Sequence, residues 1–188
     1  MSMIKVAAIH EAAHIVIAYY CGYPPNEVFV TVDGKGGYSA SYGCSHGLAI
    51  KLIERELDKD NFTIEDELEE DIFRVIAQNF LTILISGGVA EAVYINNSTS
   101  SDNIQIKLTG KDLRQAEAIS KYLGVDIEEE KRAMYECLKG KIFWDSIIHL
   151  SEKIMLSENL KLDDKQIMSS LVESGFTSFM NELTACFN

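Results

Sequence analysis

The sequence predicts a mainly α protein with a small β-hairpin or sheet, an α+β arrangement in one domain. Most of the 188 residues follow helical patterns of apolar and polar side chains. One stretch near the N-terminus instead combines two short β-branched and aromatic segments with a glycine-containing turn. Hydrophobic residues make up 47% of the chain, which is long enough to bury a sizeable core.

Residues 2–21 are expected to form a buried helix, since they combine good helix formers with apolar residues on most faces. The pattern ends at Gly22. The segments EVFVTV (27–32) and GYSASY (37–42) follow, and both are rich in residues that favour strands. Because they flank the turn sequence DGKG (33–36), we expect an antiparallel hairpin.

The remaining chain predicts further helices joined by polar segments. In order, we expect a short helix at 45–57, a long helix from a capping box at 63–66 toward 87–88, a loop at 96–103, a helix at 109–123, and amphipathic helices at 128–138, 141–157 and 163–173. Residues 1–125 should form the core of the protein. Residues 126–188 should pack on it as C-terminal helices of the same domain.

Charge and composition exclude several classes of protein. A net charge of −12 disfavours binding to nucleic acids and to anionic membrane surfaces. The four cysteines lie far apart without a C-x-x-C pair, which is typical of reduced thiols. The apolar stretches 6–20 and 75–95 contain charged or polar residues and glycines, so we expect no integral membrane segment and a cytoplasmic protein.

The sequence His10-Glu11-Ala12-Ala13-His14 is the strongest indication of function. Two histidines four positions apart lie on one face of a helix, where both imidazoles can bind one metal ion. This is the H-E-x-x-H pattern, in which the glutamate handles protons for a zinc ion. Without a metal, the same residues would be a polar cluster in the core of a helical interaction protein.

Three further segments extend this motif: GGYS at 36–39, ISGGVAE at 85–91 and TGKDL at 109–113. Together with HEAAH, and in this order, they resemble the peptidase domain of the FtsH family of ATP-dependent zinc proteases. That family carries an HEAGH helix, a GGYT strand, a GGRAAE helix segment and a TG...DL segment. The resemblance covers roughly residues 5–125 and implies a zincin-like helical fold with zinc metalloendopeptidase activity.

The resemblance also implies roles for single residues. His10, His14 and Asp112 would bind Zn²⁺, and Glu11 would be the catalytic base. The strand residues Tyr38, Ser39 and Ala40 would bind substrate in extended form at an open sheet edge, although the pattern alone fits an ordinary paired strand equally well.

The third metal ligand has alternatives. Between TG and DL this chain has only Lys111, where the family has three residues, so Asp102 on the preceding loop is a second candidate and Glu91 a third. We expect Glu91 instead to orient a ligand histidine. From the residues alone, Asp112 could also complete a capping box with Thr109.

These observations predict a zinc-dependent metallopeptidase that hydrolyses flexible or unfolded polypeptides. Only nine residues precede His10, and the chain contains no G-x-x-x-x-G-K-[ST] loop, so we expect no ATPase and ATP-independent hydrolysis. Candidate partners are a second copy of the chain and a separate ATPase. The alternative function is a non-catalytic module that keeps the peptidase fold and binds peptides or a partner.

Overall fold

The computed structural model describes residues 2–40, 67–99 and 105–186. It is mainly helical with a small three-stranded antiparallel sheet, which confirms the predicted α+β class. The elements are α1 (Met3–Tyr20), β1 (Pro25–Val30), β2 (Gly36–Ala40), α3 (Glu67–Thr99), α4 (Gly110–Leu123), α5 (Ile127–Leu138), α6 (Lys141–Leu156), a 3₁₀ turn (Glu158–Leu160), β3 (Lys161–Asp163), α7 (Asp164–Glu173) and α8 (Phe176–Ala185).

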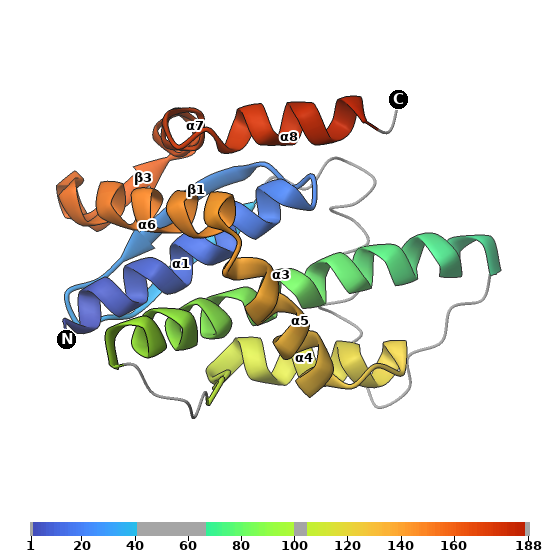
Figure 1. The fold of residues 1–188 in the computed structure, drawn as a ribbon. Coiled ribbons are helices and arrows are strands. Elements are labelled where there is room, and N and C mark those ends of the chain that lie inside the picture. Colours follow the sequence, from blue (N-terminus) through green and yellow to red (C-terminus); the bar gives the residue numbers. More distant parts are fainter. Residues whose placement is uncertain (1, 41–66, 100–104, 187–188) are drawn as a thin grey trace.

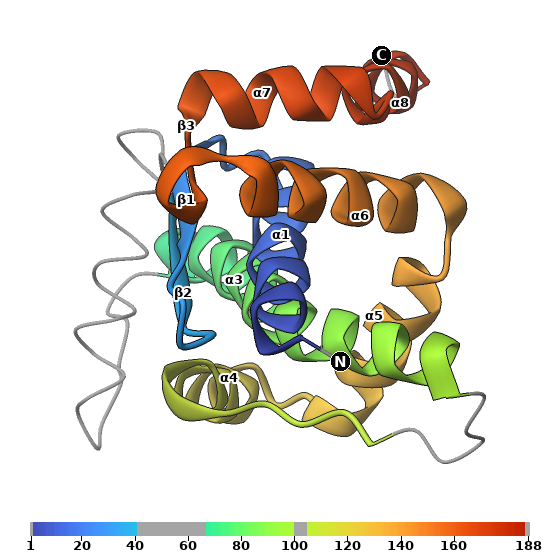
Figure 2. The same ribbon diagram turned by 90° about the vertical axis from the view of Figure 1, so that its left-hand side faces the viewer.

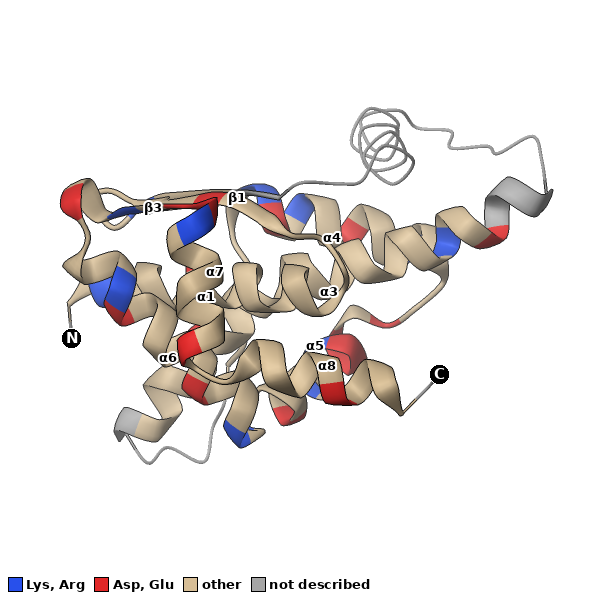
Figure 3. Ribbon diagram, turned by 90° about the horizontal axis from the view of Figure 1, so that it is seen from above, with Lys and Arg blue, Asp and Glu red and all other residues tan. Residues whose placement is uncertain are grey.

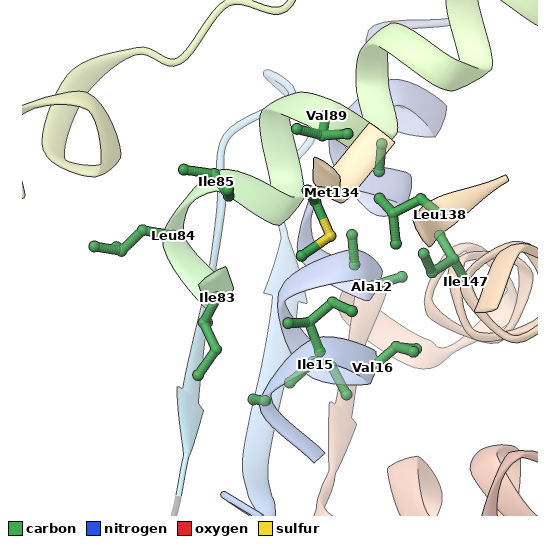
Figure 4. Packing of buried hydrophobic residues seen from close by; sticks show 14 of the residues in the cluster. Ala12, Ile15, Val16, Ile83, Leu84, Ile85, Val89, Met134, Leu138 and Ile147 are labelled. Atoms are coloured by element: carbon green, nitrogen blue, oxygen red, sulfur yellow. The ribbon is translucent and has the colours of Figure 1, made fainter. Parts of the chain in front are cut away.

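Helix α1 lies at the centre of the molecule. It packs against α3 on one side, α6 on another and the sheet on a third (Figures 1 and 2). Ten residues of α1 are buried, which explains why its sequence is apolar on most faces. Figure 4 shows Ala12, Ile15 and Val16 of this helix among side chains from α3, α5 and α6. Burial of this apolar surface is the main force that stabilises the fold.

The predicted hairpin is confirmed, and it forms two strands of the sheet. The strand order is β2-β1-β3, so β2 is an edge strand among the described strands. Within the hairpin, Val28 is paired with Tyr38 and Phe29 with Gly37. The third strand, β3, was not predicted, because three residues are too few to show an alternating pattern.

The prediction was wrong about the end of α3. The helix does not end near Gly87 and Gly88 but continues to Thr99, so residues 96–99 are helical and not part of a loop. The two glycines lie inside the helix, where their role is to allow close packing and not to end it. The predicted helix at 45–57, the capping box at 63–66 and the rest of the loop lie outside the described residues.

Two of the C-terminal helices contact the core directly, since α5 packs on α3 and α6 packs on α1. Helices α7 and α8 pack on α6, and α7 also contacts β1 (Figure 2). The observed bounds of α5, α6 and α7 agree closely with the predicted helices at 128–138, 141–157 and 163–173. Basic and acidic positions are both spread over the helices (Figure 3).

Part of α3, Asp71–Asn97, is long and apolar enough to cross a membrane by length and composition alone. Within the protein, however, 61% of its most apolar window is buried. A core helix meets the same criterion, and packing against α1 and α4 accounts for its apolar side chains. The absence of an integral membrane segment stays a prediction.

If α6 is packed on the core as described, shortening one of its buried side chains will destabilise the whole protein. Ile147 is fully buried, so Ile147→Ala should lower the free energy of unfolding by about 2–5 kcal/mol in urea denaturation. Leu156 in the same helix is 85% exposed and is the control, with an expected change within about 0.5 kcal/mol. Equal effects of the two substitutions would contradict this packing.

Candidate metal centre

The two histidines of α1 turn the same ring nitrogen toward each other. The Nε2 atoms of His10 and His14 are 2.9 Å apart, and the rings meet edge to face. His14 is almost completely buried, while the His10 side chain is 17% exposed. The spacing of four residues on a helix therefore brings both Nε2 atoms to one place, as the sequence predicted.

Hydrogen bonds to acceptors on α3 fix one proton of each ring on Nδ1. The Nδ1–H of His14 donates to the backbone carbonyl of Ile83 at 2.8 Å, and this oxygen can only accept. The Nδ1–H of His10 donates to the Glu91 carboxylate at 2.6 Å. A neutral ring with its proton on Nδ1 has a lone pair on Nε2. In this neutral form both lone pairs point to one place, where they can bind a proton or a metal ion.

Asp112, at the start of α4, brings a carboxylate to the same place. Its Oδ2 atom lies 3.3 Å from Nε2 of His10 and 3.5 Å from Nε2 of His14. Thr109 makes no side-chain capping bond, so the alternative capping box with Asp112 is not formed. The structure thus brings together the three residues that sequence analysis preferred as ligands.

The geometry of this group suits a zinc ion. Ligands at the usual 2.0–2.1 Å from a tetrahedral zinc are about 3.3 Å from one another. The three donor–donor distances here, 2.9, 3.3 and 3.5 Å, lie on both sides of that value. Two imidazoles and one carboxylate are also a ligand set of catalytic zinc sites, which keep a fourth position for water or substrate. His10, His14 and Asp112 could therefore hold a metal ion.

Gly87 makes room for this group, a role that sequence reasoning missed. A Cβ atom at this position would lie 2.6 Å from Nε2 of His10 and 2.6 Å from Nε2 of His14. Real Cβ atoms do not approach other atoms so closely, so only glycine leaves the space beside the two nitrogens open. The signal in the sequence was a glycine pair inside an otherwise regular helical pattern.

Glu11 lies beside the two histidines and is buried. Its side chain packs against Gly36 of β2, where a Cβ would be 2.7 Å from Cγ and 2.8 Å from Oε1 of Glu11. Burial raises the pKa of Glu11 above its ordinary value, and the neighbouring histidines only partly offset this effect. A carboxyl with a raised pKa is a better proton acceptor, as a general base requires.

The carboxylates around His10 make the pocket attractive to cations. Burial lowers the pKa of His10, but Asp112, Glu91 and Glu11 outweigh burial and raise it to about 10. Burial also raises the pKa of Asp112, but His10 and His14 outweigh it and hold this pKa below its ordinary value. In the metal-free protein at neutral pH, His10 therefore carries a proton that a metal ion would displace.

These residues line a cleft of about 710 Å³ between β2 and the start of α4. One wall is formed by residues 34–38, and Thr109, Gly110 and Lys111 lie in the opposite wall. Of the three residues predicted to bind an extended peptide, Tyr38 lies in this wall, and β2 is an edge strand among the described strands.

The structure places the remaining candidates as follows. Tyr38 lines the cleft, and its ring is stacked on His14. The backbones of Ser39 and Ala40 lie in β2, paired with Glu27 and Pro25. Glu91 contacts His10, as expected for a residue that orients a ligand.

Asp102, the second candidate for the third ligand, lies outside the described residues. His149 does not line the cleft and lies 3.4 Å from Glu173 on α7.

In comparisons with protein-family models, curated proteins and solved structures, nothing matches this chain significantly.

Proposed function

We propose that this protein is a zinc-dependent metalloendopeptidase that hydrolyses flexible or unfolded polypeptides without ATP. The observation that carries the proposal is the convergence of His10, His14 and Asp112 beside the buried carboxyl group of Glu11. The ordered resemblance of the sequence motifs to the FtsH peptidase domain supports the same conclusion. We propose the zincin-like fold of that domain on the same grounds.

His10, His14 and Asp112 would hold the zinc ion. When bound, zinc would act as a Lewis acid on the peptide carbonyl and lower the pKa of water at the site. Glu11 would take the proton of the attacking water and then give it to the amine that leaves as the C–N bond breaks. Glu91 and the carbonyl of Ile83 keep the two imidazoles in the tautomer that binds metal.

The cleft supports a polypeptide as substrate. Edge strand β2 offers backbone groups to an extended chain of any sequence, and the metal ligands lie next to it. A folded protein cannot present an extended segment of this kind without local unfolding, so flexible chains are the favoured substrates. A separate ATPase or a second copy of the chain remains a candidate partner.

The decisive experiment separates metal binding from catalysis. The Glu11→Gln variant should still bind one zinc per chain but cleave an unfolded protein at least about 100 times more slowly, because it lacks the general base. The His14→Ala variant should lose both zinc and cleavage. Zinc is measured by elemental analysis after purification without added metal, and cleavage by the release of fluorescent peptide fragments.

Each hypothesis gives a different result in this experiment. If wild-type protein binds zinc but cleaves no peptide in a broad library, the protein is the non-catalytic binding module. Wild-type protein that binds no zinc, and keeps its structure in the presence of a chelator, contains only a polar cluster, and the proposal is then wrong.

Gly87→Ala should destroy the metal site without unfolding the protein. The added methyl group would contact both Nε2 atoms, so we expect a loss of stoichiometric zinc binding. Alanine favours a helix over glycine by about 1 kcal/mol, which offsets part of the strain. Zinc affinity is measured by chelator competition, with Val75→Ala at an exposed position of α3 as the control. Wild-type affinity in Gly87→Ala would contradict the assigned geometry.

Zinc affinity should increase with pH. In the metal-free protein the pKa of His10 is raised to about 10, so at pH 6–8 zinc must displace its proton. The release of one proton predicts an affinity that rises about tenfold for each pH unit in this range. Competition with a chelator of known pH dependence measures the slope, and an affinity that is independent of pH would exclude His10 as a protonated ligand.

A further inference from the structure

Tyr38 lies on the face of β2 that is turned toward α1. In the hairpin it is paired with Val28, whose side chain is fully buried, and directly opposed residues place their side chains on the same face. Gly37, its neighbour, is paired with Phe29, which is 37% exposed on the other face. The register of the hairpin therefore points Tyr38 at the helix that carries the histidines.

On this face, two alternate residues of β2 contact two functional residues of α1. Gly36 packs against Glu11, and the ring of Tyr38 is stacked on the imidazole of His14. The ring centroids are 5.1 Å apart, and the ring planes differ by 18°. Aromatic pairs at such distances attract each other beyond the effect of the area they bury.

The stacked ring restricts the one motion that would disable His14 as a ligand. Its Nδ1–H is held at the ring edge by the carbonyl of Ile83, which fixes one point of the imidazole. Rotation of the ring plane about that point would swing Nε2 away from Asp112. A flat ring against the face of the imidazole opposes this rotation, because a tilted imidazole would collide with it.

We propose that Tyr38 is a positioning residue for His14, and that its aromatic ring keeps Nε2 directed at the metal. This inference rests on the proposed function, since it concerns the affinity of the zinc site. It assigns Tyr38 a role different from the substrate contact that the sequence suggested. The aromatic ring carries the role, so phenylalanine should replace tyrosine and an aliphatic side chain should not.

Zinc affinity measured by chelator competition tests this role in wild-type protein and three variants. Tyr38→Phe should stay within about threefold of wild type, while Tyr38→Leu should bind zinc about 10–100 times more weakly, as is usual when a partner of a ligand histidine is lost. Phe29→Leu removes an aromatic ring from the opposite face of the same hairpin and should leave zinc affinity unchanged.

The outcomes distinguish this inference from the proposed function. Equal zinc affinity of wild type and Tyr38→Leu overturns the positioning role and leaves the proposed function standing. Weakening by Phe29→Leu as strong as by Tyr38→Leu also overturns it, because the effect then belongs to the hairpin. If wild-type protein binds no zinc, the proposed function fails and the positioning role fails with it.

A second measurement does not depend on the stability of Tyr38→Leu. Thermal melting of each metal-free variant shows whether it is folded, and Tyr38→Ile, a β-branched residue suited to a strand, replaces Tyr38→Leu if that variant is unfolded. NMR of the metal-free protein provides the second measurement. The ring protons of His14 in wild-type protein should be shifted upfield, relative to an unstacked histidine, by the ring current of Tyr38. The shift should persist in Tyr38→Phe, and its absence from wild type overturns the inference.

Discussion

The candidate site depends on one face of α3 packed against α1. Ile83, Gly87 and Glu91 are spaced four residues apart, so they lie on successive turns of the same helix face. Ile83 and Glu91 accept the Nδ1 protons of His14 and His10. Gly87, between them, leaves the space beside both Nε2 atoms open. One helix face thus supplies two hydrogen-bond acceptors with an open space between them. This arrangement directs the Nε2 atoms of both histidines to one point.

Strand β2 of the sheet supports the same residues from a second direction. Strand β2 meets the other side of α1, where Gly36 gives room to Glu11 and Tyr38 covers the ring of His14. The same strand forms a wall of the cleft. The groups proposed for proton transfer and metal binding are therefore contacted from two sides, by a helix and by a strand, and such support helps an active site keep its geometry without substrate.

The burial of so many polar groups has an energetic meaning. Glu11 and His14 are buried and His10 and Asp112 are partly exposed, and unpaired charges and lone pairs are costly where water is excluded. Carboxylates that surround imidazoles stabilise a positive charge at their centre, which explains the raised pKa of His10. A proton offsets part of this cost in the metal-free protein. A divalent cation would offset more, since it accepts both imidazole lone pairs and the carboxylate together.

The sequence alone determined the local features, because each depends on residues within a few positions of one another. These features are the helical segments, the hairpin around the turn at 33–36, and the position of two imidazoles on one helix face. Tertiary structure decided the rest. It brought Ile83, Glu91 and Asp112 to the histidines across 69, 81 and 102 residues, left Thr109 without its capping bond, and extended α3 past two glycines that serve a close approach. These outcomes depend on how helices pack, and a local pattern of residue types does not show which distant surface a side chain will meet. Asp112 and Glu91 could be predicted beside the histidines only from the resemblance of the ordered motifs to a known family.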